Sequence, residues 1–234
     1  MATRREKLRV ESIDEIKALA RRQMAQEGTA GISLRGIARD MGMTAPAIYR
    51  YFPSRDDLIT ALIVDAYLAH ADAIDAADAR CARTSYGDRV AHMMFAYRAW
   101  ALANPVDFQL IYGNPIPGYE APREVTVPAA SRVSAPIITA LTEAYAAGAL
   151  RPTPEFLHLP EAVERHLRAF AEAGGYPVPP EIFAIAMHGW NLIHGTVWLE
   201  LFGHTPPVIG DPEAFCRHQV IALCRSMNLS VTDT

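Results

Sequence analysis

Apolar residues in the first quarter of the chain recur at helical spacing, and residues that start and stop helices divide them. The spacing predicts a first helix over residues 10–27, with Ile13, Ile16, Ala20 and Met24 on its inner face. Ser33 is placed to cap a second, short helix over residues 34–41. These elements predict a chain that begins with compact helices.

The turn after the second helix carries its own signals. Gly42 can adopt the left-handed conformation that ends a helix, and Thr44 follows as the cap of a third helix with Pro46 in its first turn. The third helix is expected to continue to Tyr51 and to end before Pro53. Two short helices joined by a glycine turn predict a helix-turn-helix, the motif that enters a DNA major groove.

The rest of the chain is also helical in pattern. Ser54 and Asp57 form a capping box for a long fourth helix, which is expected to connect the first three helices to the remainder. Further helices are predicted over residues 85–104, 105–112, 129–148, 161–173, 181–202 and 211–227. No strand pattern emerges. The predicted fold is therefore all-α, with a three-helix head over residues 1–56 and a helical body over residues 57–234.

Two segments are predicted to lack regular structure. The basic residues Arg4, Arg5, Lys7 and Arg9 form an N-terminal arm, either a solubilising tail or a set of phosphate or minor-groove contacts. The second segment, residues 113–128, holds four prolines and two glycines, and we interpret it as a mobile flap over a pocket.

Charge is unevenly distributed. Residues 1–56 hold eleven Lys or Arg against seven Asp or Glu, which gives them a net charge of +4. Because the net charge of the whole chain is −4, residues 57–234 carry a net charge of −8. A basic head on an acidic body is typical of a DNA-binding module attached to another domain.

Other classes of function find little support. There is no apolar run long enough to cross a membrane, and the charged N-terminus is not a signal region, which predicts a cytoplasmic protein. Cys81, Cys216 and Cys224 show no metal or disulfide spacing. His188 and His194 are six residues apart, and no nucleotide-binding or hydrolase motif occurs in context, so we expect no metal, no cofactor and no catalytic residues.

The stretch SLRGIARDMGMTAPAIYRYFPSRDDLITAL resembles the DNA-binding signature of TetR-family transcriptional regulators. The resemblance covers residues 13–62. A second likeness, at Trp190, His194 and Gly195, is to the Trp-His-Gly subclass of TetR C-terminal domains. Together they imply a homodimeric regulator, most often a repressor, that leaves a palindromic operator when a small molecule binds.

The resemblance implies DNA contacts at matching positions. Bases would be approached by the start of the third helix and by Arg50, which is the strongest candidate for a guanine contact. Arg35, Tyr49 and Arg55 are candidates for phosphate contacts, and Arg35 also for a base contact. Ile48 is expected to face inward. The complete candidate set is Arg35, Thr44, Ala45, Pro46, Ala47, Tyr49, Arg50, Tyr51 and Arg55.

Two further sets are expected in the body. Aromatic residues are candidates for lining an effector pocket, although most aromatics at helical spacing are simply core: Phe95, Tyr97, Trp100, Phe108, Tyr112 and Trp190. The last two long helices are candidates for the interface with a second copy, unless their apolar face is intramolecular core: Ile182, Ile185, Gly189, Ile193, Val197, Phe215, Val220 and Leu223. The alternative from another class is a helical enzyme or small-molecule carrier with a vestigial helix-turn-helix.

Overall fold

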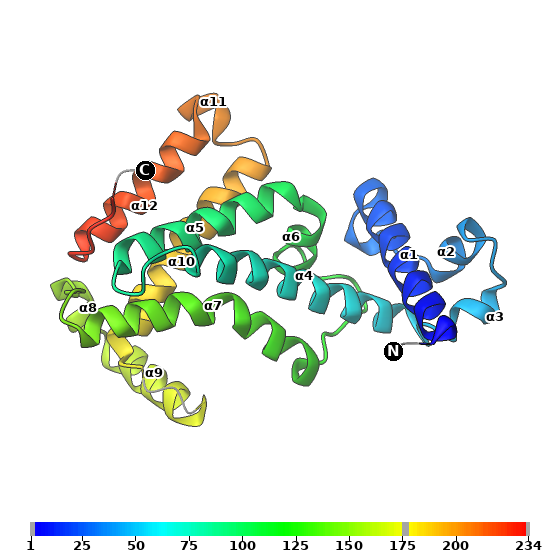
Figure 1. Ribbon diagram of the computed structural model, residues 1–234, viewed down its shortest axis with the longest axis horizontal. Coiled ribbons are helices and arrows are strands. Elements are labelled where there is room, and N and C mark those ends of the chain that lie inside the picture. Colours follow the sequence, from blue (N-terminus) through cyan, green and yellow to red (C-terminus); the bar gives the residue numbers. More distant parts are fainter. Residues whose placement is uncertain (1–2, 175–177, 233–234) are drawn as a thin grey trace. The chain divides into compact units, whose positions relative to one another are not determined.

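Figure 1 shows the computed structural model, which describes residues 3–174 and 178–232. Throughout these two ranges the regular structure is helical and no strand occurs, which confirms the predicted all-α fold. The elements are α1 (Arg4–Glu27), η1 (Thr29–Gly31), α2 (Leu34–Asp40), α3 (Ala45–Ile48), α4 (Arg55–Asp78), α5 (Tyr86–Ala103), α6 (Pro105–Tyr112), α7 (Arg123–Ala146), α8 (Pro154–Leu157), α9 (Glu161–Gly174), α10 (Pro180–Leu201), α11 (Pro206–Ile209) and α12 (Pro212–Ser226).

The chain forms two compact units. The first contains residues 1–69 and 104–130, and the second contains residues 70–103 and 131–234. The first unit is larger than the head predicted for residues 1–56, because it also includes the start of α4, all of α6 and the segment after α6. The helices α4 and α7 each contribute residues to both units.

The core of the first unit is built from the apolar faces of α1, α2, α3, α4 and α6. The predicted inner residues Ile16, Ala20 and Met24 of α1 are at most 3% exposed. Two ion pairs hold α1 in place: Lys17 Nζ lies 2.7 Å from Asp65 Oδ2 on α4, and Arg21 Nε lies 2.9 Å from Asp107 Oδ1 on α6. The position of α1 against α4 and α6 is thereby fixed by both burial and charge.

The start of α1 corrects one prediction. The helix begins at Arg4 rather than near Val10, so the basic arm forms the first turns of a helix. Thr3 and Glu6 make a capping box, in which Thr3 Oγ1 accepts from the Glu6 N–H at 3.2 Å and Glu6 Oε2 accepts from the Thr3 N–H at 2.6 Å. The Thr-x-x-Glu pattern in the sequence was the signal for this earlier start.

The predicted flap is also wrong over part of its length. α7 begins at Arg123 and includes Pro128 and Pro136. Each proline removes one backbone hydrogen bond from the helix, but the burial of Val133, Leu141 and other residues of α7 outweighs that loss. The shorter segment before α7 packs against the first unit: Ile116 is 6% exposed in its core, and Tyr119 Oη lies 2.9 Å from Thr60 Oγ1 of α4.

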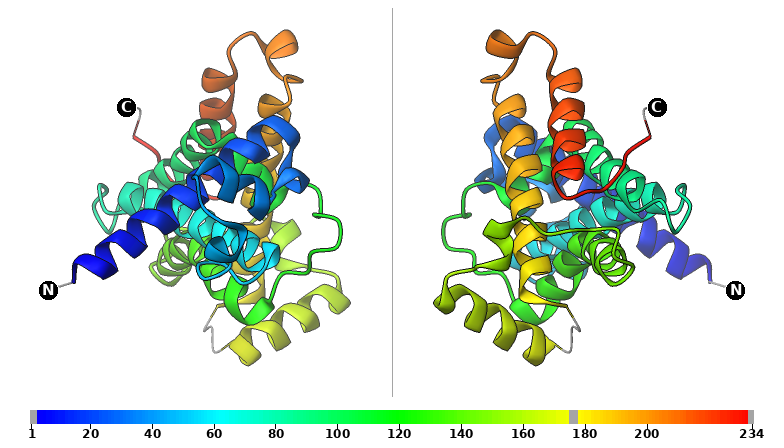
Figure 2. Two further views of the ribbon diagram at one scale, coloured as in Figure 1. Left: turned by 90° about the vertical axis from the view of Figure 1, so that its right-hand side faces the viewer. Right: turned by 90° about the vertical axis from the view of Figure 1, so that its left-hand side faces the viewer.

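The second unit is centred on α5, α10 and α12. Figure 2 shows α10 and α12 side by side, joined through α11. α5 packs against both helices, and Arg98 of α5 forms a two-bonded ion pair with Glu200 of α10, at 2.6 and 2.8 Å. The residues after α12 lie against the start of α5, where Thr232 donates to Asp88 Oδ1 through its N–H at 2.7 Å and its hydroxyl at 2.9 Å.

Candidate nucleic-acid interface

The turn between α2 and α3 has the predicted geometry. Ser33 Oγ accepts the Gly36 N–H at 3.2 Å and caps α2. Gly42 has φ of 64°, and the Met43 N–H returns to the Ala38 carbonyl at 2.8 Å. This closed turn fixes the angle between the two helices and positions α3 as the second helix of a helix-turn-helix.

α3 presents one buried and one exposed side. Ile48 is fully buried in the core of the first unit, as predicted. The residues on the opposite side are exposed: Thr44, Ala45, Pro46, Tyr49 and Arg50. Ala47 is half-buried. Tyr51 is half-buried against the core cluster. The exposed side is therefore free of large apolar groups other than the Tyr49 ring.

Regular helix ends earlier than predicted. α3 stops at Ile48 rather than Tyr51, and the backbone continues in tighter turns with the Arg50 N–H bonded to the Ala47 carbonyl at 3.3 Å and the Tyr51 N–H bonded to the Ile48 carbonyl at 2.9 Å. Pro53 disfavours helical backbone only at Phe52, so it accounts for the end of the turns at residues 49–52 and not for the end of regular helix at Ile48.

The candidate cations are of two kinds. Arg35 and Arg50 are exposed and form no ion pair with any residue in the described ranges. Arg55, in contrast, donates to the backbone carbonyls of Ile32 at 3.1 Å and Ala30 at 3.0 Å. Its guanidinium therefore holds the loop between α1 and α2, a role that sequence reasoning did not identify.

The sequence placed Arg9 in the basic arm but did not predict what its side chain contacts within the chain. Its guanidinium lies 5.3 Å from the centroid of the Tyr51 ring, and its Nη2 donates to the Arg50 carbonyl at 3.4 Å. The separation of 41 residues hides this contact from any local pattern.

In the second unit, aromatic and histidine rings of α4, α5 and α10 come together. His70 stacks on Trp100 at 4.3 Å between centroids, and Tyr97 Oη lies 2.8 Å from His194 Nδ1. Burial, and secondarily the nearby His194, lowers the pKa of His70 to about 3. The Trp190 side chain is 40% exposed, and the centroids of the Trp190 and His194 rings lie 5.1 Å apart.

The six pocket candidates lie on α5, α6 and α10. Tyr97 and Trp100 share the ring cluster of the second unit, whereas Phe108 and Tyr112 contact each other in the first unit. Phe95 lies elsewhere on α5, under the Arg217 guanidinium at 5.0 Å. That these side chains line an effector pocket stays a prediction.

Most of the predicted interface residues are core of the single chain. Six of the eight are at most 9% exposed: Ile182, Ile185, Ile193, Val197, Val220 and Leu223. Gly189 and Phe215 are half-buried. These six side chains are therefore buried within the single chain, where α5, α10 and α12 pack against one another.

A different side of α10 is exposed and apolar. With the following α11 it carries large hydrophobic side chains that are 36–80% exposed: Met187, Trp190, Leu199, Phe202, Val208 and Ile209. We call this set the α10–α11 face. The sequence pattern could not select it, because α10 is apolar on nearly all sides.

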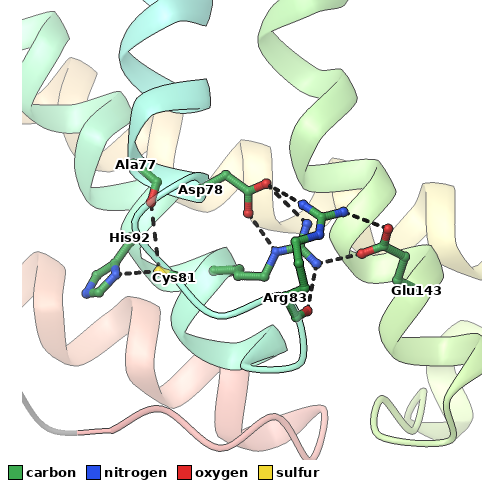
Figure 3. A network of polar contacts seen from close by, with 7 residues as sticks. Ala77, Asp78, Cys81, Arg83, His92 and Glu143 are labelled. Carbon is green, nitrogen blue, oxygen red and sulfur yellow. Dashed lines mark hydrogen bonds and ion pairs between the residues drawn. The ribbon is translucent and has the colours of Figure 1, made fainter.

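An ion-pair cluster joins the C-terminal end of α4 to α5 and α7 (Figure 3). Arg89 is fully buried and donates to Asp78 Oδ1 at 2.7 Å and to Glu143 Oε2 at 2.6 Å. Arg83 joins the same two carboxylates at 3.0 and 2.8 Å. Beside this cluster, Cys81 Sγ lies 2.9 Å from His92 Nδ1.

The remaining chemistry is limited in the part of the chain that the structure describes. Within it, no three His, Cys, Asp or Glu side chains are grouped as a metal site would require. Burial raises the pKa of Cys216 to about 11 and that of Cys224 to about 12, so both thiols stay protonated at neutral pH. No helix in the described ranges has the length and apolar character to span a membrane.

Two family models match the chain. The family described as "Bacterial regulatory proteins, tetR family" matches residues 16–62, which contain the helix-turn-helix. The family described as "Tetracyclin repressor-like, C-terminal domain" matches residues 90–223. The Trp-His-Gly likeness at Trp190, His194 and Gly195 stays a prediction beside this broader match.

Relatives and solved structures agree. The HTH-type transcriptional regulators Rv1816 of Mycobacterium tuberculosis (strain H37Rv) and Mb1846 of Mycobacterium bovis are each 36% identical over 199 residues, covering 85% of this chain and 84% of the relative. The crystal structure of regulatory protein SCO4313 is 36% identical, with a TM-score of 0.78 over 94% of this chain and 98% of that one. A TetR-family protein from Rhodococcus RHA1, at 17% identity and a TM-score of 0.65, shares the fold.

These matches place a DNA-binding helix-turn-helix and a helical regulatory body in one chain. The chain belongs to the TetR family of bacterial transcriptional regulators.

Proposed function

We propose that this regulator is a repressor that binds a palindromic operator as a homodimer, in the bacterial cytoplasm, and is released by a small-molecule effector. The observation that carries the DNA-binding part is α3: its inner side is anchored by the fully buried Ile48, while its outer side is exposed and small. A helix anchored in this way can approach base edges closely.

The side chains of α3 suggest what is recognised. Ala45, Pro46 and Ala47 offer no hydrogen-bond donor from their side chains, so they favour close approach and contact with thymine methyl groups. Arg50, exposed beside them, can bond the O6 and N7 of a guanine. We assign phosphate contacts to Arg35 and Tyr49, which are both exposed, with a base contact as the alternative for Arg35. Arg55 can contribute a phosphate contact only with the part of its guanidinium not bonded to carbonyls.

Useful specificity requires two copies. One short helix contacts a few base pairs, so a symmetric pair on two half-sites is needed to select an operator from a genome. The α10–α11 face is the exposed apolar surface best suited to a second copy, because six large hydrophobic side chains lie on consecutive elements of one unit. We therefore move the proposed interface from the buried residues of α10 and α12 to this face.

A small molecule bound to the helical body would release the regulator from DNA. A ligand that binds better to one geometry of the dimer than to another shifts the DNA-binding equilibrium by its difference in affinity. The ring cluster of the second unit supplies aromatic surface and a polar Tyr97–His194 pair, the mixture of groups typical of small-molecule sites.

The test is a selection followed by a gel shift. Wild-type protein should enrich a two-fold symmetric duplex from a random library, and its affinity should fall steeply as salt rises. Arg50→Ala should lower operator affinity about tenfold or more while leaving random-duplex affinity nearly unchanged, since a good base contact contributes roughly 1–3 kcal/mol of discrimination. Arg35→Ala is the matched control and should weaken both duplexes alike if it contacts phosphate. Enrichment of no duplex, even at low salt, would contradict the proposed function.

A further inference from the structure

We propose that Arg9 is a positioning residue for DNA recognition: it holds the C-terminal end of α3 and so sets the angle at which α3 meets bases. This inference rests on the proposed role of α3 and adds a determinant that lies outside the helix-turn-helix, in the first turns of α1.

The end of α3 needs external support. The helix is four residues long, and the Thr44 side chain makes no capping hydrogen bond at its start. So short a helix has little stability of its own. Its inner side is held by Ile48, but the turns at residues 49–51 follow the last regular residue and leave carbonyl groups without helical partners.

Arg9 supplies two of the missing interactions at that end. Its Nη2 donates to the Arg50 carbonyl at 3.4 Å, and a cation is favourable at the negative end of a helix. Its guanidinium also lies 5.3 Å from the centroid of the Tyr51 ring, within the range of a cation–π interaction. Tyr51 also packs against the core cluster of the first unit, so its side chain contacts both Arg9 and the core.

The placement of Arg9 follows from how α1 is built. Every residue from Thr3 to Val10 is exposed, so no burial holds these turns in helical form. The capping box of Thr3 and Glu6 starts the helix there, and the pairs of Lys17 with Asp65 and Arg21 with Asp107 fix the helix axis further along. Arg9 thus extends from a well-anchored helix to the end of a poorly anchored one.

The proposal differs measurably from the simpler view of Arg9 as one more phosphate contact. Losing a phosphate contact weakens all duplexes alike and lowers the salt slope by about 1. Losing a positioning contact weakens the operator and leaves random DNA and the salt slope unchanged. The probes are the duplex that wild-type protein enriches from a random library and a shuffled duplex of the same length.

Arg9→Ala should reduce the ratio of operator to shuffled-duplex affinity about five- to tenfold, with an unchanged thermal melt because the side chain is exposed. Arg9→Lys should restore the ratio only in part, because a single ammonium group keeps the charge but cannot contact the Tyr51 ring and the Arg50 carbonyl with separate atoms of a planar fork. Combining Arg9→Ala with Tyr51→Leu should add little to the loss from Tyr51→Leu alone. Arg5→Ala, in the same exposed turns, is the control and should keep the ratio.

Three results would overturn the proposal: an unchanged ratio in Arg9→Ala, an equal loss on both duplexes with a smaller salt slope, or full recovery in Arg9→Lys. If wild-type protein enriches no duplex at all, the proposed function has failed instead, and the two failures are distinguished by this first arm.

Discussion

Arg89 illustrates how a buried charge is held in this protein. Its guanidinium is fully buried and is balanced by Asp78 and Glu143. The hydrogen bond from Arg89 is the main influence that lowers the pKa of Glu143. A buried ion pair adds little stability compared with an apolar contact of similar size. Removing one partner, however, leaves a buried charge without compensation and lowers the stability strongly.

Arg89→Met should destabilise the second unit by roughly 3 kcal/mol, the lower end for a broken buried pair, because Arg83 still neutralises Asp78. Urea unfolding followed by circular dichroism measures the change. Arg132→Ala is the matched control: Arg132 pairs with Asp72 and Asp75 on the surface, and its loss should cost less than about 1 kcal/mol. Equal losses in the two variants would argue against a special role for the buried cluster.

His70 makes the stability of the protein depend on pH. Burial, with a smaller contribution from His194, lowers the pKa of His70 to about 3, so this ring is neutral in the folded state. Below about pH 6.5 the unfolded chain binds a proton that the folded chain does not, and stability is lost as pH falls from 6.5 towards 3. At pH 5 the loss attributable to His70 should be about 2 kcal/mol.

Urea unfolding at pH 7.5 and pH 5.0 measures this loss. His70→Leu should be destabilised at pH 7.5 because it loses the stacking on Trp100, but it should lose less stability than wild type between the two pH values. His194 and Tyr97 face the same ring, so some pH dependence should remain in the variant. An identical slope in both proteins would show that His70 does not titrate as inferred.

At the scale of elements, the α2–α3 turn depends on one backbone conformation. Gly42 has φ of 64°, a region that disfavours a side chain. Gly42→Ala should therefore cost about 1 kcal/mol of stability and weaken operator binding, because the angle of α3 follows from this turn. Gly42→Asn should cost less, since asparagine tolerates the left-handed region. Thermal melts and gel shifts of the two variants provide the comparison, and an Asn variant that is worse than Ala would contradict the argument.

Local chemistry explains which elements the sequence could predict. Ser33, Gly42 and Ser54 act on backbone groups within a few residues, and the structure confirms the cap or turn predicted at each. Asp57, the partner of Ser54 in the predicted capping box, accepts from the Ser54 hydroxyl. The start of α7 was misplaced because a proline is only locally unfavourable, and burial of residues such as Leu141 along the helix outweighs it. A local pattern contains no information about that burial.

The candidate site shows the same division. The inward direction of Ile48 follows from the cap and the helical period, and the structure bears it out. The contacts of Arg9 with Tyr51 and of Arg55 with the Ala30 carbonyl could not be predicted, because they join residues 25 or more positions apart. The identity of the buried side of α10 was equally hidden, since a helix that is apolar all round can pack either way.

At the scale of the whole molecule, the proposed dimer requires a surface that a second copy covers. Residues such as Ile193 and Val197 are excluded because the single chain already buries them. In the α10–α11 face, Leu199 is 48% and Phe202 is 45% exposed, which is unfavourable unless another surface covers them. Gly195 lies on α10 with open space where a side chain would project, so its small size has no role within one protomer.

Leu199→Glu should therefore convert the dimer to a monomer with little effect on the fold, because the new carboxylate is solvated in one copy but buried without a partner between two. Sedimentation equilibrium measures the mass, and a thermal melt of the monomer checks the fold. Operator affinity should fall at least a hundredfold, since a single half-site remains engaged. Val125→Glu is the matched control, a substitution at an equally exposed apolar residue of α7 in the first unit, and it should leave the dimer intact. A Leu199→Glu protein that stays dimeric would place the interface on another surface and would leave the exposed side of α10 without its proposed partner.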